Sequence, residues 1–346
     1  MKISNFYKLL IILATITFLT SACSKQSSLD HDDEVKDIKE NPFKGEGDET
    51  VVMGALNHGF SNPKIDNNGE MIPLTYNGGE LKIDYLVNAS GKAKNIGFLI
   101  FIDGLPQPYK INSEEESYEF LHVMDLAEDN KDMPLSFIFT PITGKKGDTL
   151  SVSISSIYNP SFIPDMKETS SYGGYHVALE AVSSLVFQQD PDTTVFSKIK
   201  KNQSLIDVSL YKELVTNEML DKELIDLDRL DHQVFTGVYS EDEEKMENIQ
   251  INDDGSLKVK FKIFGHPNVR YRNTFYINHK PVSSKEGSSF ETEVTKGNMS
   301  IIDVNIDVKD LEDFNTFYVV SVPINANDFP DDVIVLEKTP SILLYR

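Results

Sequence analysis

From Gly79 onward the chain consists of short apolar or alternating runs separated by turn residues. The runs in "ELKIDYLVNAS", "NIGFLIFIDG", "PLSFIFTPIT" and "DTLSVSISSIY" are rich in Ile, Val, Phe and Thr, and Gly, Asn, Asp or Pro bounds each of them. This pattern predicts β-strands. "LSVSISSI" alternates strictly, which predicts one buried and one wet face. "FLIFI" is continuous, which predicts a central strand covered on both faces.

The C-terminal third repeats the order of these runs. "GELKIDYLVNASGKAKNIGFLIFIDG", which starts at Gly79, resembles "GSLKVKFKIFGHPNVRYRNTFYINHK", which starts at Gly255. Residues 147–165 then resemble 314–332, and 177–187 resemble 334–345. Blocks that recur in one order with little change in spacing indicate an internal duplication. Chance similarity between alternating strands is the alternative.

Each copy is about 90 to 110 residues long with about seven strands, which resembles an immunoglobulin-like β-sandwich. The chain has one cysteine and no tryptophan, so the Cys…Trp…Cys signature of antibody domains is missing. Fibronectin-like and bacterial immunoglobulin-like sandwiches lack that signature too. The predicted fold class is therefore all-β, with two tandem immunoglobulin-like β-sandwich domains.

The change of pattern along the chain predicts the domain boundaries. The first sandwich is assigned to residues 51–190 and the second to 232–346. Residues 191–231 are interpreted as a linker, because their leucines follow no single period. A short helix near Asn217–Leu230 is predicted within it.

The first residues have the anatomy of a secretory signal peptide. Lys2 and Lys8 precede the apolar run "LLIILATITFLT", which is shorter than the roughly 20 residues of a membrane-spanning helix. "LTSAC" then resembles the lipobox of bacterial lipoproteins, with Thr20 where leucine is most common. The resemblance covers residues 1–28. It implies cleavage after residue 22 and attachment of a diacylglycerol, with palmitate-type chains, to Cys23.

The lipobox resemblance also implies a location. Two or more acyl chains anchor a protein stably, so we expect the lipid bilayer of the cell membrane or outer membrane to hold acylated Cys23 on the extracytoplasmic side. A free thiol left after ordinary signal cleavage is the alternative. Residues 23–50 are polar and charged, which predicts a flexible, disordered tether.

The charge of the chain excludes nucleic acid as a partner. The formal net charge is −22, and loss of residues 1–22, which carry two lysines and no acid, makes it −24. Such a body is repelled by phosphate backbones and by anionic headgroups. An acidic surface that keeps an exported protein soluble explains the charge, and a cationic partner is the alternative.

The sequence contains no catalytic motif of the common classes. There is no G-x-S-x-G elbow, H-E-x-x-H motif, P-loop or dinucleotide fingerprint, and the seven histidines are dispersed. "QINDDG" fails as a calcium loop, because position twelve would be Phe261. We therefore predict no enzyme activity, no metal site and no cofactor.

One segment between two predicted strands favours recognition. "YNPSFIPDMKETSSYGGYH" is rich in Tyr, Ser, Gly and Pro, which supply rigid, amphipathic contact area. The candidate contact residues are Tyr158, Phe162, Tyr172, Tyr175 and His176. Packing of these aromatic residues onto the sandwich edge is the alternative.

Together these features predict a membrane-anchored extracytoplasmic lipoprotein that acts as a non-enzymatic binding or structural module. Its expected partner is a protein or other surface ligand. The alternatives are an extracytoplasmic hydrolase with a site built from scattered residues, and an accessory subunit of a membrane complex.

Overall fold

The computed structural model describes residues 55–346 apart from 92, 94, 127–130, 163–177, 199–203, 252–254 and 285–286. All the described residues fall within one compact unit. The predicted signal peptide 1–22, Cys23 and the predicted tether 23–50 lie outside the described residues.

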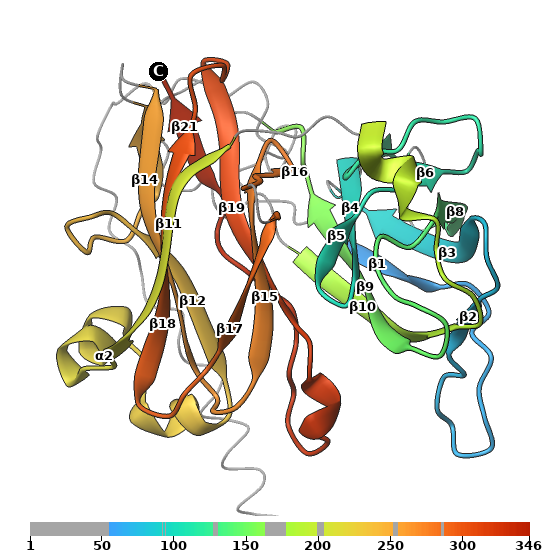
Figure 1. Ribbon diagram of the computed structural model, residues 1–346, viewed down its shortest axis with the longest axis horizontal. Helices are drawn as coiled ribbons and strands as arrows, with labels where there is room; N and C mark the ends of the chain where they lie inside the picture. Colours follow the sequence, from blue (N-terminus) through green and yellow to red (C-terminus); the bar gives the residue numbers. More distant parts are fainter. Residues whose placement is uncertain are drawn as a thin grey trace, which may run out of the picture. The chain divides into compact units, whose positions relative to one another are not determined.

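The first sandwich has two facing sheets (Figure 1). One has the order β1 (Ala55–Phe60), β3 (Leu81–Ser90), β8 (Met133–Phe139) and β6 (Lys110–Ile111). The other has the order β2 (Leu74–Tyr76), β10 (Ala178–Phe187), β9 (Thr149–Tyr158), β4 (Asn95–Ile102) and β5 (Leu105–Gln107), and β7 (Val123–Asp125) also pairs with β4. The orders β1-β3-β8-β6 and β10-β9-β4 reproduce the ABED and CFG sheets of the immunoglobulin fold.

The second sandwich has the same arrangement of two sheets. One sheet has the order β11 (Leu205–Leu214), β18 (Asn298–Asp307), β14 (Ser256–Gly265) and β12 (Val234–Tyr239). The other has the order β13 (Asn248–Gln250), β21 (Ile342–Tyr345), β19 (Phe314–Pro323), β15 (Arg270–Ile277) and β16 (Lys280–Pro281); β17 (Ser289–Glu293) pairs with β15, and β20 (Glu337–Lys338) with β19. In both sandwiches one short strand, β2 or β13, runs parallel to its neighbour.

The sheet orders confirm the predicted fold class of two tandem immunoglobulin-like sandwiches. The segments that resemble each other in sequence fill the same places: β3 and β14, β4 and β15, and β9 and β19. The last strand of the first sandwich, β10, is continuous. Its counterpart in the second sandwich is divided at Thr339–Ser341 into β20 and β21.

The interpretation of 191–231 as a linker misses one strand. β11 lies inside that range and pairs along its length with β18, so it belongs to the second sandwich. The equivalent place in the first sandwich is held by the two-residue strand β6. Since β11 occurs in one copy only, the repeat gave no signal for it.

The described part of this range contains helical structure only in short segments. The helix predicted over Asn217–Leu230 is α2 (Asn217–Glu223), with Thr216 as its N-cap and Leu224 in the left-handed conformation at its end. Short 3₁₀ segments follow at η3 (Leu227–Asp231) and precede β11 at η2 (Thr193–Lys198), and another lies outside this range at η4 (Ala326–Asp328). The left-handed Leu224 ends the helix, as residues in that conformation commonly do.

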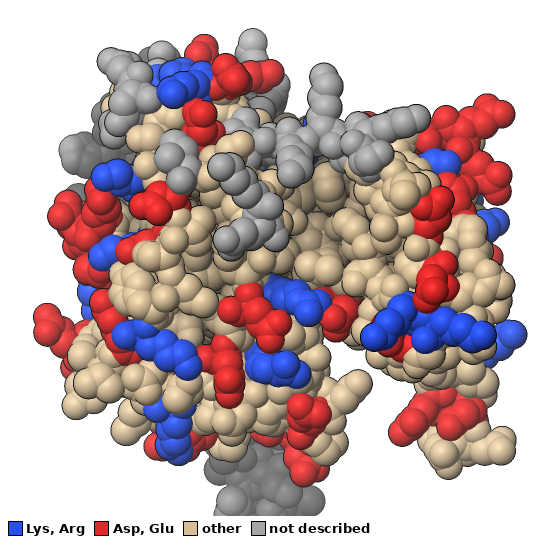
Figure 2. Space-filling model, viewed as in Figure 1, with Lys and Arg blue, Asp and Glu red and all other residues tan. Residues whose placement is uncertain are grey.

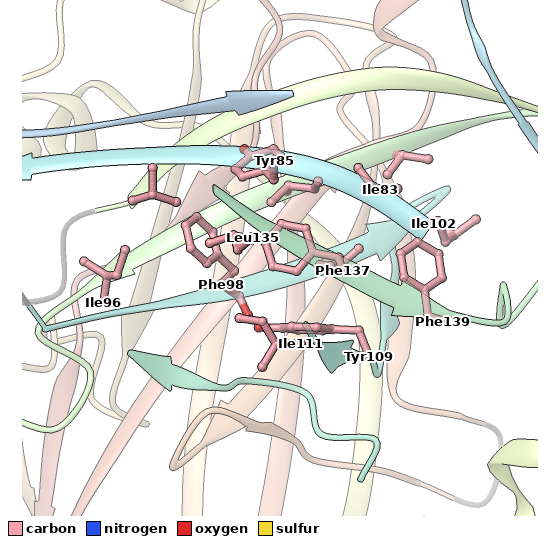
Figure 3. Packing of buried hydrophobic residues seen from close by; sticks show 14 of the residues in the cluster. Ile83, Tyr85, Ile96, Phe98, Ile102, Tyr109, Ile111, Leu135, Phe137 and Phe139 are labelled. Atoms are coloured by element: carbon pink, nitrogen blue, oxygen red, sulfur yellow. The ribbon is translucent and has the colours of Figure 1, made fainter. Parts of the chain in front are cut away.

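The core of the first sandwich centres on four aromatic rings from three strands and a connecting segment (Figure 3). Phe137 lies 5.1 Å from Tyr85, 5.3 Å from Phe98 and 5.2 Å from Tyr109, measured between ring centroids. The Tyr109 hydroxyl donates to the Phe98 carbonyl at 2.8 Å, so its polar atom is satisfied inside the core. Each fully buried aromatic side chain contributes about 2 to 3 kcal/mol to the free energy of unfolding.

Candidate functional site

The outer faces of the two larger sheets pack against each other. A cluster of buried residues joins Leu99, Phe101 and Ile157 of the first sandwich to four residues of the second: Tyr276, Tyr318, Val320 and Val322. The Tyr276 and Tyr318 rings are stacked, with centroids 5.1 Å apart. The two sandwiches therefore share a hydrophobic core and are not independent domains joined only by the chain between them.

This contact explains the burial of two strands. β4 is covered on both faces as predicted, because Phe98 and Ile100 point into the first core and Leu99 and Phe101 into the shared one. The prediction for β9 was wrong. Ser153 and Ser155 should lie on a wet face, yet they are 3% and 1% exposed, because the second sandwich covers them.

Two hairpin turns make reciprocal contacts across this interface. Asp103 and Gly104, between β4 and β5, have φ of 50° and 75°, and the equivalent Asn278 and His279 have φ of 47° and 61°. Each turn reaches the opposite sandwich: Asp103 bonds to Arg272, and His279 lies against Pro160. Equivalent turns of the two copies thus both take part in the interface, but with different partner residues.

His279 is enclosed in this interface. Its Nδ1 lies 3.0 Å from the Tyr318 hydroxyl, and its Nε2 lies 2.9 Å from the Pro160 carbonyl. Burial lowers the pKa of His279 to about 4. The imidazole is therefore neutral at physiological pH and acts as a hydrogen-bonded part of the interface.

Glutamates from equivalent positions of the two copies lie near each other, since Glu180 bonds to the residue that precedes Glu337. Glu180 lies in "VALEAV" and Glu337 in "IVLEKT". Glu180 Oε2 accepts a hydrogen bond of 2.9 Å from the Leu336 backbone N–H, and the Glu180 carboxylate also interacts with the Ser153 hydroxyl. Burial raises the pKa of Glu180, and burial together with the Glu180 charge raises that of Glu337 to about 7.

The neighbouring cation does not neutralise this pair. Lys338 Nζ donates to the Thr339 carbonyl and the Ser341 hydroxyl, both at 3.0 Å, and lies 4.4 Å from the Tyr318 ring centroid. Burial lowers the pKa of Lys338 to about 7. These hydrogen bonds direct the Lys338 side chain toward Thr339 and Ser341, between β20 and β21, rather than toward Glu337.

A cleft of about 590 Å³ opens beside Glu337 in the second sandwich. It separates η3 and the start of β12 from the segment that leads into β20. Its apolar lining includes two exposed valines, Val333 at 82% and Val335 at 42%, and continues through other residues: Val234, Phe235, Tyr271 and Ile334. Its polar lining comprises Arg229, His232, Gln233, Asp331, Asp332 and Glu337. This volume is within the usual range for small-ligand sites.

The rim of the cleft is fixed by polar contacts. Arg229 donates to the Gln233 side-chain oxygen at 2.6 and 2.9 Å and lies over the Phe235 ring. Asp332 Oδ2 lies 3.1 Å from Nε2 of the buried His266, and Asp332 Oδ1 lies 3.5 Å from Nδ1 of His232. The hydrogen bond with His266 lowers the pKa of Asp332, so this carboxylate is ionised. The rim is therefore ordered, and Glu337 is the acid of the lining whose pKa burial raises.

The candidate residues chosen from sequence do not form this site. Tyr158 and Phe162 are 7% and 8% exposed, and Phe162 packs against Leu343 of the second sandwich. These two side chains therefore offer no contact surface. Tyr172, Tyr175 and His176 lie outside the described residues. The sequence did hold a signal for the glutamate pair, because a Glu follows Leu inside the same apolar strand of both copies.

One histidine–serine contact invites a catalytic interpretation. His58 Nε2 lies 3.0 Å from Ser156 Oγ, and its Nδ1 lies 2.6 Å from the Tyr85 hydroxyl. Ser156 is fully buried, so its hydroxyl cannot reach a substrate in this structure. In the part of the chain that the structure describes, no three His, Asp or Glu side chains are placed to hold a metal ion, and no helix is long and apolar enough to cross a membrane.

No protein-family model matches the sequence, and no curated protein matches it. Among solved structures the chain is similar to the C-terminal domain of the AgI/II polypeptide BspA of Streptococcus agalactiae, with 11% identity over 84% of this chain and 100% of that one, at a TM-score of 0.22. It is similar to the C-terminal domain of the antigen I/II-family protein AspA of Streptococcus pyogenes, with 8% identity over 86% and 100% of the chains, at 0.20. The chain is also similar to the N-terminal Ig1-2 module of the Drosophila receptor protein tyrosine phosphatase DLAR, with 11% identity over 84% of this chain and 97% of that one, at a TM-score of 0.19. TM-scores of this size carry no functional argument, and the fold assignment rests on the sheet orders.

Proposed function

We propose that this protein is a lipid-anchored, extracytoplasmic binding module whose two sandwiches act as one rigid body. The observation that carries the proposal is the shared core between the outer faces of the two larger sheets. Because that core and the Asp103–Arg272 and His279–Pro160 contacts tie the sandwiches together, the pair presents a fixed surface rather than two mobile domains. The ligand site in this proposal is the cleft beside Glu337.

The lipid anchor rests on the sequence around Cys23. In this proposal acyl chains on Cys23, which the lipobox resemblance implies, hold the folded body at the extracytoplasmic face of the cell membrane or outer membrane. The acid excess of the chain supports a partner other than nucleic acid. Figure 2 shows Asp and Glu side chains interspersed with Lys and Arg on the face in view, which gives no large basic surface there.

Fractionation of cells tests the anchor. Cys23→Ser should move the protein from the membrane fraction to the soluble one and abolish its labelling by radioactive palmitate. Ser28→Ala, a nearby change outside the cleavage site, should leave both properties unchanged. Membrane association of Cys23→Ser equal to that of the natural protein contradicts the anchor.

Site-specific photo-crosslinking tests the binding role. A photoreactive residue in place of Val333, on the rim of the cleft, should give one defined adduct in intact cells. The same residue in place of Leu214, which is 71% exposed on β11, provides the control. Equal labelling patterns from the two positions contradict a specific site at the cleft.

A further inference from the structure

The turn that ends α2 carries a leucine where the backbone favours glycine. Ile225 N–H donates to the Leu220 carbonyl at 2.9 Å. Leu224 N–H donates to the Asp221 carbonyl at 3.3 Å, and these two hydrogen bonds form a Schellman motif. Glycine is the usual residue at the left-handed position of this motif, because a Cβ is unfavourable there. In this chain the position is held by Leu224, with φ of 55°.

The fold makes no use of the Leu224 side chain. It is 86% exposed, and no other large apolar side chain of the described residues is as exposed. The hydrophobic contact that accompanies a Schellman motif is made by Leu220 and Ile225, which belong to one apolar cluster beneath α2. Leu227, at the start of η3, is 65% exposed and also lies outside that cluster. An apolar side chain kept at the surface against the backbone preference points to a contact outside the chain.

The exposure of the two leucines limits the size of what can cover them. Sites for small ligands enclose most of the ligand surface. The fold encloses neither Leu224 nor Leu227, so a small molecule on them would stay largely in water. A partner that removes both side chains from water must bring an extended apolar surface of its own. Such a surface belongs to another macromolecule or to a membrane.

The charge around the leucines selects among these. Residues 213–232, which include α2 and η3, contain two basic residues, Lys222 and Arg229, and seven acids: Glu213, Glu218, Asp221, Glu223, Asp226, Asp228 and Asp231. Two of the acids are neutralised, since Glu223 pairs with Lys245 and Asp231 with Lys296. Asp226 and Asp228, on either side of Leu227, are exposed and form no ion pair with a described residue. This charge repels phosphate backbones and anionic headgroups and favours a basic polypeptide surface.

We infer that Leu224, Leu227, Asp226 and Asp228 form a docking surface for a basic, apolar segment of another protein. Apolar side chains of that segment cover the two leucines, and its lysines or arginines lie against the two aspartates. The inference goes beyond the proposed function, whose site is the cleft beside Glu337, because none of these four residues lines the cleft.

Calorimetry with the mature chain carrying Cys23→Ser, which has no acyl chains, tests the docking surface. The probe is an amphipathic helical peptide built of leucine and lysine, and its counterpart has glutamate in place of every lysine. The leucine–lysine peptide should bind at least about tenfold more tightly than the leucine–glutamate peptide, because only its charge is opposite to that of the surface. Its affinity should fall as the salt concentration rises, since salt screens exposed charges.

Leu224→Gly separates docking from folding. The variant should bind the leucine–lysine peptide about tenfold or more weakly, because burial of one leucine side chain changes a binding constant by about that factor. It should unfold at the same temperature as the natural protein or at a higher one, because glycine suits the left-handed position. A structural role of the Leu224 side chain would instead lower the unfolding temperature.

Ile65→Ala is the matched control. Ile65 is 52% exposed and precedes an aspartate in the first sandwich, so it offers the same chemistry at another place. This variant should bind the leucine–lysine peptide like the natural protein. The double variant Asp226→Asn and Asp228→Asn should bind it more weakly and with a smaller dependence on salt. Unchanged binding by Leu224→Gly, or equal binding of the two peptides, overturns the inference.

Other occupants of the surface give different results. Binding to phosphatidylcholine vesicles that Leu224→Gly abolishes would identify a lipid surface. Self-association in sedimentation that Leu224→Gly abolishes would identify a second copy of the chain, and either result overturns the assignment to a basic partner. The proposed function fails or stands separately, because its test is the adduct formed at Val333 on the rim of the cleft.

Discussion

Arg272 of the second sandwich donates through Nη1 to both the backbone carbonyl and the carboxylate of Asp103 in the first, with Nη1 2.5 Å from Oδ2. Asp103 lies in a left-handed turn, with φ of 50°, and the two side chains are 25% and 23% exposed. Because one guanidinium nitrogen binds a turn carbonyl and its side chain together, this contact fixes the position of the first hairpin on the second sandwich.

Arg272→Met should lower the free energy of unfolding by about 1 to 2 kcal/mol, because it removes charge-assisted hydrogen bonds that are mostly shielded from water. Arg270→Met, two residues earlier on β15, is the control. Arg270 is 46% exposed and pairs with Glu291 at 3.5 Å, so its loss should cost less than about 0.5 kcal/mol. Urea unfolding of the two variants measures the difference, and equal midpoints would falsify the role assigned to Arg272.

Gly104→Ala should destabilise the protein more than Gly69→Ala. Both glycines have positive φ, of 75° and 88°, so each alanine carries about 1 to 2 kcal/mol of backbone strain. At Gly104 the added Cβ would also lie 2.9 Å from Arg272 Cβ, whereas nothing lies within 4 Å at Gly69. Gly104→Ala should therefore lower the free energy of unfolding by about 1 kcal/mol more than Gly69→Ala does, and thermal unfolding of the two variants measures the difference. The same midpoint for both variants would show that the interface yields without cost.

The neutral state of His279 predicts loss of stability in acid. Its pKa is lowered from 6.5 to about 4 in the folded protein, so between these values the unfolded chain binds a proton that the folded chain does not. The contribution is fully present above pH 6.5 and is lost as the pH falls toward 4, by about 3 kcal/mol.

His279→Asn isolates this effect, because asparagine tolerates the left-handed conformation and does not titrate. Urea unfolding of both proteins near pH 7 and near pH 4.5 measures it, and the natural protein should lose more stability in acid. His58, whose pKa burial also lowers to about 4, is retained in both proteins and cancels in the comparison. Parallel acid curves for the two proteins are the result that contradicts the assignment.

The place of β11 predicts where the second sandwich begins. A fragment of residues 204–346 contains β11, which covers the edge of β18 and packs Leu205 and Val208 against the second core. A fragment of residues 232–346 lacks it and should be less stable by about 3 kcal/mol or more, since it loses both apolar burial and a strand ladder. Both fragments expose the same interface sheet, so circular dichroism melting compares them directly. Equal melting temperatures would mean that β11 is dispensable.

The strands and the duplication follow from local pattern. "ELKIDYLVNAS" and "SLKVKFKIFG" alternate because one side of each strand faces a core, and that relation is visible in any single strand. Repetition of the pattern then gives two sandwiches. Short turns such as Asp103–Gly104 and Asn278–His279 reinforce it, because their sequence positions in the two copies match.

The candidate site could not be predicted in the same way. Tyr158 and Phe162 are in a loop-like sequence and look exposed, yet the second sandwich and the sandwich core bury them. Val333 and Val335 look like core positions of a strand, yet they line an open cleft, because the pairing between β20 and β19 includes Glu337 and Lys338 but not the residues before them. Exposure at these positions depends on what a distant segment covers.

By itself, then, the sequence determined the all-β class, the position of most strands and the duplication, because alternation and turn residues record contacts within one sheet and its own core. Only the tertiary structure decided that Ser153 and Ser155 are buried, that β11 completes the second sandwich, and that Glu180 bonds to the backbone of the second sandwich at Leu336. The physical reason is that the sequence of a strand shows which of its side chains can be buried. Which surface covers them depends on how the two sandwiches pack against each other.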